Sequence, residues 1–168
     1  MSEKKSFTFT KLPEKIEELK ACPGADLKDP YAVAALAIAA FCSFTADKEA
    51  CYEMINYLKG PEALSGMDKQ FISDRFMDGR DYVVRSYFNG TSPDNNYQPE
   101  VPYTIQVEDN PYSRDEAGYI KLYVKSSGAD SLRPVQLRNK PSTGEWFLWN
   151  FSGVLTDIRA PKTADPWA

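Results

Sequence analysis

The stretch Asp74-Arg-Phe-Met-Asp-Gly-Arg-Asp-Tyr82 marks a change in the spacing of the apolar residues along this chain. Before Gly79 the apolar residues recur at intervals of three and four, which is typical of amphipathic helices. From Tyr82 to about Ile158 they alternate or run together, as they do in strands. A helical first part and a stranded second part predict an α+β protein, in which an N-terminal layer of four helices packs on one bent antiparallel sheet.

The helices are predicted in the first part of the chain, residues 12–79. The clearest one follows Asp29 as a cap and Pro30 at the first helical position, and it covers Tyr31 to Phe44 without a single charge. A helix that is apolar on every side has to be surrounded by protein, so we expect it at the centre of the helical layer. The other three helices are predicted over 13–21, after a cap at Thr45 or Asp47, and after a capping box formed by Ser65 and Asp68.

The strands are predicted in the second part, residues 82–158. Residues 103–107 and 119–124 alternate between apolar and polar, and Pro141-Ser-Thr-Gly144 is typical of a hairpin turn. The return strand 145–151 is apolar on both faces, so we expect it to be central in the sheet. Further strands are predicted over 82–88, around Val135 and Leu137, and over 154–158, with an irregular tail over 159–168.

Composition limits the partners and the location that we expect. The chain has 168 residues and a net charge of −4, with acidic and basic residues interspersed. Nucleic-acid binding requires a concentrated basic face, so no nucleic-acid partner is expected. The longest apolar stretch, Tyr31 to Phe44, is shorter than the about 20 residues that a membrane span requires. With no apolar signal segment after Met1, the sequence predicts one cytoplasmic domain over residues 1–168, without a membrane partner.

Several common kinds of active site are excluded by residue type. The chain contains no histidine, which removes catalytic triads, Cys–His nucleophiles and zinc sites of the HExxH type. It also lacks the glycine-rich loops that bind phosphates, and its three cysteines form no CxxC pair. We therefore expect no cofactor and no metal, and a protein that binds rather than one that catalyses.

An aspartate cluster provides an alternative, enzymatic hypothesis. Asp74 and Asp78 are four residues apart on a predicted helix, and Asp81 follows shortly after. Paired carboxylates serve in general acid–base catalysis, so these residues are candidates for a histidine-independent hydrolase or isomerase. The competing interpretation is a helix end whose acids are neutralised by neighbouring arginines, namely Arg75, Arg80 and Arg85.

Aromatic residues on adjacent predicted strands provide the main hypothesis. Tyr119, Tyr123, Trp149 and either Trp146 or Phe147 could stack on a ligand ring or anchor a peptide, or else fill the core. Tyr97 lies in the long loop 91–102, which is either a recognition loop or a plain connector. Together they predict a non-catalytic binding or interaction module, whose partner is a protein or a small molecule that the sequence does not identify. The oligomeric state is equally open.

Five segments of the chain resemble an uncharacterised domain-of-unknown-function family of bacterial proteins, common in Firmicutes. The segments are residues 29–36, 74–82, 133–137, 141–149 and 157–161, so the resemblance extends from about residue 29 to the C-terminus. It implies a bacterial, intracellular protein, but no activity and no functional residues. At the level of fold, the last strands are similar to those of SH3-like barrels. The order of helices followed by a curved meander is similar to rolls of the nuclear-transport-factor-2-like fold.

Overall fold

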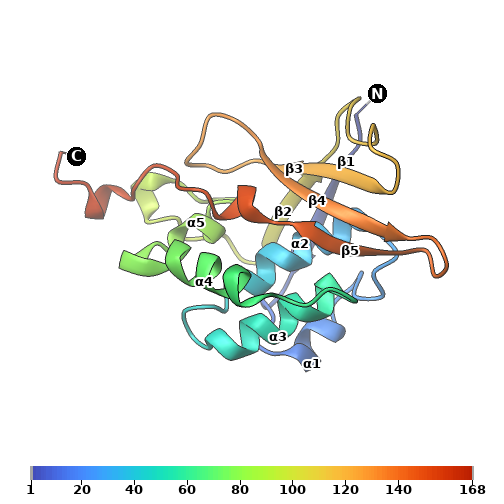
Figure 1. Ribbon diagram of the computed structural model, residues 1–168. Coiled ribbons are helices and arrows are strands. Elements are labelled where there is room, and N and C mark those ends of the chain that lie inside the picture. The colour runs from blue at the N-terminus through green and yellow to red at the C-terminus, as the bar shows by residue number, and fades with distance from the viewer. Residues whose placement is uncertain (1, 168) are drawn as a thin grey trace.

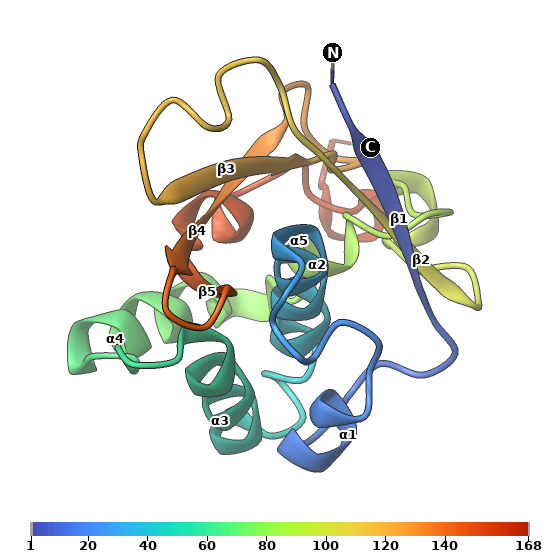
Figure 2. The same ribbon diagram turned by 90° about the vertical axis from the view of Figure 1, so that its right-hand side faces the viewer.

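A computed structural model describes residues 2–167, and its central element is helix α2 (Pro30–Phe41) (Figure 1). The sheet curls around this helix as half of a barrel. In Figure 2, β1 and β2 lie on one side of α2, β3 lies above it, and β4 and β5 lie on the other side. Helices α1 and α3 cover the open side below. The predicted α+β class and the bent antiparallel meander are confirmed.

Helix α2 forms and ends as its sequence dictates. The Asp29 carboxylate accepts a hydrogen bond from the Tyr31 backbone N–H at 2.9 Å, and Pro30 occupies the first turn. Every residue of the helix after Pro30 is buried, so the helix is surrounded by protein as predicted, but it lies in the hollow of the sheet rather than at the centre of a helical layer. The helix ends at Phe41 rather than Phe44, because the N–H groups of Ser43 and Phe44 bond to the carbonyls three residues earlier, as in a 3₁₀ turn.

Four further α-helices cover the open side of the sheet and one of its ends. They are α1 (Ile16–Lys20), α3 (Lys48–Lys59), α4 (Gly66–Arg75) and α5 (Tyr82–Arg85). The predicted caps are confirmed. The Asp47 carboxylate accepts from the Ala50 N–H at 3.0 Å, and Ser65 and Asp68 form a reciprocal capping box. These caps satisfy N–H groups that a helix start otherwise leaves without a partner.

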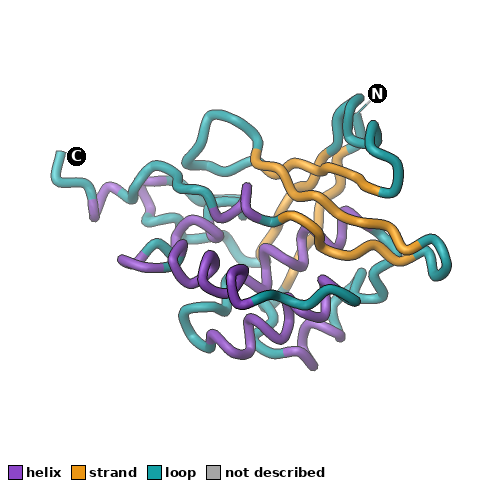
Figure 3. Tube along the Cα trace, viewed as in Figure 1, coloured by secondary structure: helices purple, strands orange, loops and turns teal. Residues whose placement is uncertain are grey.

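The sheet has five antiparallel strands in the order β1-β2-β3-β4-β5 (Figure 3). They are β1 (Lys4–Phe9), β2 (Tyr103–Glu108), β3 (Tyr119–Val124), β4 (Arg133–Lys140) and β5 (Glu145–Asn150). Alternate side chains point into the hollow of the sheet and pack against α2. The buried inward residues of the last four strands are Ile105, Val107, Ile120, Leu122, Val124, Val135, Leu137 and Leu148.

The prediction that the fold begins with a four-helix layer is wrong. The first element is strand β1, which pairs along its whole length with β2, from Lys4 opposite Glu108 to Phe9 opposite Tyr103. The alternation of polar and apolar residues in Ser6-Phe-Thr-Phe-Thr10 is typical of a strand. Strand β1 was nevertheless missed, because its partner strand lies far along the chain, after all the α-helices.

Three strand predictions also need correction. Residues 82–88 contain the short helix α5 and one isolated bridge, between Phe88 and Ile105. Val83, Val84, Tyr87 and Phe88 are all buried, a spacing that fits one face of a helical turn. Residues 152–155 form a 3₁₀ turn rather than the start of a strand. Strand β5, which was expected at the centre of the sheet, is an edge strand. Both of its faces are apolar because helices pack on its inner face and the turn after α3 packs on its outer face.

A buried carboxylate fastens the first strand to the rest of the fold. Asp109 follows β2, and its side chain accepts from the Glu3 backbone N–H at 2.6 Å. It also accepts from the Tyr31 hydroxyl and from the Arg114 guanidinium, both at 2.8 Å. Asp109 is 5% exposed, and the four groups form a clamp around this buried carboxylate that joins β1, α2 and the loop after β2. We refer to them as the Asp109 clamp.

The Asp109 clamp makes stability depend on pH at the acid end. Burial by itself would raise the pKa of Asp109, but hydrogen bonds from Arg114, the Glu3 N–H and Tyr31 outweigh it and lower the pKa to about 2. Because the folded pKa is the lower one, the contribution is fully present above about pH 4 and is lost as the pH falls towards 2. This shift corresponds to about 2 kcal/mol.

Urea unfolding at pH 5 and near pH 2 tests this contribution. Wild-type protein is expected to lose about 2 kcal/mol more unfolding free energy between these pH values than an Asp109→Asn variant does. Equal losses in the two proteins would show that Asp109 titrates normally in the folded state.

Candidate ligand-binding site

The outer face of the sheet carries an aromatic and cationic corner on strands β3, β4 and β5. Tyr119, Arg138 and Phe147 lie opposite one another on the three neighbouring strands. Trp149 follows two residues after Phe147 and therefore points to the same side. These side chains alternate along the strands with core residues that point into the hollow of the sheet, so they themselves point outwards.

Arg138 is held between two of these rings. Its guanidinium carbon lies 4.7 Å from the centroid of the Trp149 ring and 5.7 Å from that of Tyr119, and the two rings meet edge to face at 5.8 Å. Cation–π contacts of this kind orient a guanidinium without using its N–H groups. Within residues 2–167, the guanidinium makes no ion pair and no hydrogen bond. Arg138 is exposed, so its planar fork of donors is open to water or to a ligand.

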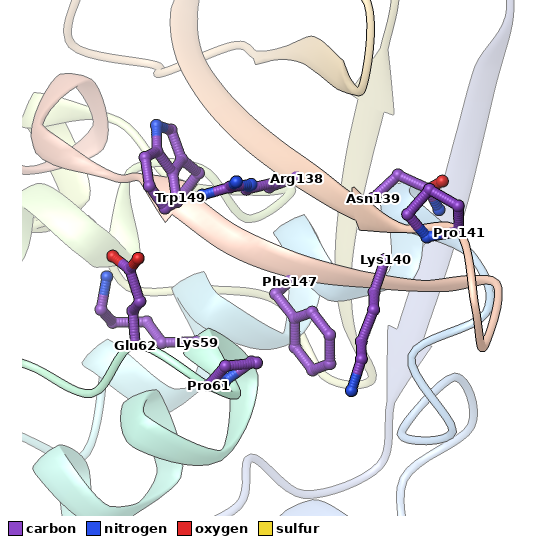
Figure 4. A pocket seen from close by; sticks show the side chains of 9 residues that line it. All are labelled: Lys59, Pro61, Glu62, Arg138, Asn139, Lys140, Pro141, Phe147 and Trp149. Atoms are coloured by element: carbon purple, nitrogen blue, oxygen red, sulfur yellow. The ribbon is translucent and has the colours of Figure 1, made fainter.

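A pocket of about 330 Å³ opens beside Arg138, between the β4–β5 hairpin and the turn after α3 (Figure 4). Gly60 in that turn has φ of 67°, and its α-carbon lies directly against the ring of Phe147. This close contact brings the turn up to the sheet. The pocket is lined by Lys59, Pro61, Glu62, Arg138, Asn139, Lys140, Pro141, Phe147 and Trp149.

Cations outnumber carboxylates in this pocket. Lys59, Arg138 and Lys140 carry positive charge, and Glu62 carries the one negative charge among the lining residues. In the part of the chain that the structure describes, no ion pair within 4.0 Å involves any of these four side chains. The lining thus combines a net positive charge with apolar walls from Phe147 and the two prolines, which suits an anion that carries an organic group.

The predicted aromatic residues separate into two groups. Tyr119 and Trp149 meet at the Arg138 corner, and Tyr123 lies further along β3 on the same outer face, opposite Pro134. Trp146 instead faces inwards and packs against the core, and its backbone N–H donates to the Leu27 carbonyl at 2.7 Å. Phe147, the alternative to Trp146, is the residue that lines the pocket.

Tyr97 lies away from this pocket, in the loop between α5 and β2. Its side chain is completely buried, its hydroxyl donates to the Arg159 carbonyl at 2.6 Å, and its ring stacks on Tyr82 at 5.5 Å. Arg85 fixes the same loop, because it donates to the carbonyls of Asn96 and Tyr97 at 3.1 and 3.2 Å. These contacts make the middle of the loop a packed connection between α5 and the C-terminal segment.

The three candidate aspartates lie at the joint between α4 and α5. Asp74 is exposed, and its carboxylate accepts from the Gln70 amide at 2.8 Å. Asp81 forms an ion pair with Arg85 at 2.8 Å. Asp78 is exposed and shares a cleft of about 490 Å³ with Asp81, whereas Asp74 does not line this cleft. The structure therefore brings Asp78 and Asp81 to one cleft and leaves Asp74 outside it.

The cysteines offer no reactive thiol in the described structure. Burial raises the pKa of Cys42 and of Cys51 to about 12, and burial also raises that of Cys22. A nucleophilic cysteine requires the opposite shift.

The sequence reasoning missed Lys59, Arg138 and Lys140. Arg138 and Lys140 alternate along β4, so a strand prediction places them on one face. Lys59 ends a helix far earlier in the chain and resembles any solvent-exposed lysine in the sequence. That all three line one pocket depends on how the turn after α3 meets the hairpin, which no local pattern reports.

Comparison with known proteins gives one finding. A family model described as "Domain of unknown function (DUF6935)" matches residues 11–162, a range that includes every residue lining the pocket. Searches of curated proteins and of solved structures return no match. Among residues 2–167, none of the helices has both the length and the apolar character needed to cross a membrane.

Proposed function

The chain belongs to the DUF6935 family of domains of unknown function, and from its own geometry we propose that it is a binding module for a small anionic ligand. The ligand would occupy the pocket between the β4–β5 hairpin and the turn after α3. This proposal keeps the predicted roles of Tyr119 and Trp149, and it adds the cations as the groups that select the ligand.

The proposal rests mainly on the contacts of the Arg138 guanidinium. Two aromatic rings hold its guanidinium, and its N–H groups have no partner within residues 2–167. Arg85 shows the contrasting case, because it bonds to the Asp81 carboxylate and to two backbone carbonyls. A fixed fork of donors matches the two oxygens of a carboxylate or a phosphate.

The rest of the lining supports a small organic ligand. The pocket volume of about 330 Å³ lies at the lower end of the range for small-molecule sites. Phe147 and Trp149 provide aromatic surface beside the cations, so an anion attached to a ring can use both kinds of contact.

Titration of isotope-labelled protein by NMR spectroscopy tests the proposal, with benzoate and phenyl phosphate as anionic probes and benzylamine as a cationic one. Both anions are expected to shift the amide signals of residues 59–62 and 138–149 with affinities in the millimolar range. The Arg138→Met variant is expected to bind both anions at least about tenfold more weakly, because it keeps the side-chain stem and loses the donors.

Lys121→Met is the matched control, since Lys121 is exposed on the same outer face but lies outside the pocket. It removes the same charge and should leave both affinities unchanged. Binding of benzylamine at this site, or full anion affinity in Arg138→Met, would contradict the proposal.

A further inference from the structure

The pocket contains a buried lysine whose ammonium group has no anionic partner, and from it we infer that the ligand is a small-molecule phosphate monoester. This inference rests on the proposed function and assigns its ligand class. The phosphate would contact Lys59 and Arg138, and the organic part would lie against Phe147 and Trp149.

Lys59 is the main reason for this assignment. It lies in the last turn of α3 and is only 8% exposed, with Nζ 5.8 Å from the centroid of the Phe151 ring. No hydrogen bond or ion pair within residues 2–167 involves Nζ. Every fully sealed side-chain nitrogen or oxygen in this part of the chain has a hydrogen-bond partner, so Nζ keeps some contact with solvent. In Figure 4 it lies beside the Glu62 side chain, at the edge of the pocket that Lys59 lines.

The stem of Lys59 is buried while its ammonium keeps contact with solvent, as is common for lysines that pack along apolar surface. A bound anion would pair with this charge. The ammonium is a compact charge that suits phosphate, whereas the guanidinium of Arg138 supplies the two-pronged contact.

The balance of charge favours a dianion over a carboxylate. Lys59, Arg138 and Lys140 together with Glu62 leave an excess of two positive charges in the lining. A phosphate monoester carries close to two negative charges at neutral pH, because its second pKa is about 6. Glu62, which is exposed at the edge of the pocket, can accept a hydrogen bond from a hydroxyl group of the organic part.

Wild-type protein alone provides the first test. Phenyl phosphate and benzoate share a ring and differ in charge, so their affinities are compared at pH 5.0 and pH 7.5. Phenyl phosphate is expected to bind roughly tenfold more tightly at the higher pH, where it becomes a dianion, and benzoate to bind equally at both. The groups that face the probe are Lys59, Glu62, Arg138 and Lys140, and the chain contains no histidine to titrate in this interval.

A pair of lysine variants provides the second test. Lys59→Met is expected to weaken phenyl phosphate about tenfold and benzoate less than about threefold, because the dianion depends more on the second cation. The variant keeps the apolar stem that packs on the protein, so it should melt close to wild type. Lys69→Met is the matched control: its Nζ lies 5.4 Å from the Tyr52 ring, outside the pocket, and its loss should change neither affinity.

The outcomes separate the two proposals. If both probes bind at the pocket but phenyl phosphate shows no gain with pH, the phosphate assignment is wrong and anion binding stands. If neither probe binds there, both proposals fail. Should Lys59→Met not fold, the comparison of the two probes in wild-type protein still decides.

Discussion

An Asp109→Ala variant is expected to lose about 3–4 kcal/mol of unfolding free energy, a large part of the stability of a domain of this size. The carboxylate is the common acceptor for the Glu3 N–H, the Tyr31 hydroxyl and the Arg114 guanidinium. Its removal leaves the first two donors buried without a partner. The lost hydrogen bond of Arg114 costs less free energy, because its side chain is 61% exposed and can bond to water instead.

Urea unfolding at pH 7, followed by circular dichroism, measures this loss. Asp109→Asn keeps the shape and one acceptor oxygen, so about half of the loss is expected for it. Asp115→Asn is the control: Asp115 is exposed and makes no ion pair within residues 2–167, so its replacement should change stability by less than about 0.5 kcal/mol. A loss below about 1 kcal/mol in Asp109→Ala would show that the clamp is not a principal attachment of β1.

Gly60→Ala should be the second most damaging change, at about 3 kcal/mol. Gly60 has φ of 67° and ψ of −123°, a conformation that residues with a Cβ rarely adopt, and strain of this kind costs about 1–3 kcal/mol. The added Cβ would also overlap the Phe147 ring. Since that ring is a wall of the pocket, the variant should also weaken binding of phenyl phosphate.

Gly66→Ala is the matched control for this change. A Cβ added at Gly66 has no heavy atom within 4 Å, and its φ is not positive, so its stability should equal or slightly exceed that of wild type. Adding Phe147→Ala to Gly60→Ala relieves the overlap but not the backbone strain. The double variant should therefore lose less than the sum of the single losses, and strict additivity in thermal unfolding would contradict the proposed contact.

The elements that the sequence predicts well are those defined by neighbouring residues. Helix α2 is recognised from its cap at Asp29, its proline and its lack of charge, and strand β3 from its simple alternation. The elements that the sequence predicts wrongly are those that depend on partners far away in the chain. Strand β1 requires β2 to complete its hydrogen bonds, and residues 82–88 contain apolar neighbours that suit a strand and a buried turn equally well.

The candidate site shows the same division. Tyr119 and Trp149 could be placed together from the sequence, because strand alternation and hairpin register are local properties. Lys59 could not, because it lies far from β4 and β5 in the sequence, and only the folded chain brings the end of α3 to the hairpin. The inward direction of Trp146 was equally hidden, since β5 is apolar on both faces and its alternation does not reveal which face is covered.

The pairing of β1 with β2 has a consequence for the time course of synthesis. The chain has to be made as far as Glu108 before β1 has a complete partner, which takes on the order of ten seconds at usual rates of translation. During that interval Phe7 and Phe9 have no sheet to join, and α2 lacks the cover that the sheet gives to part of its apolar surface. Contacts between residues so far apart in sequence form slowly. Newly made chains of this protein should therefore depend on chaperones until the second strand emerges from the ribosome.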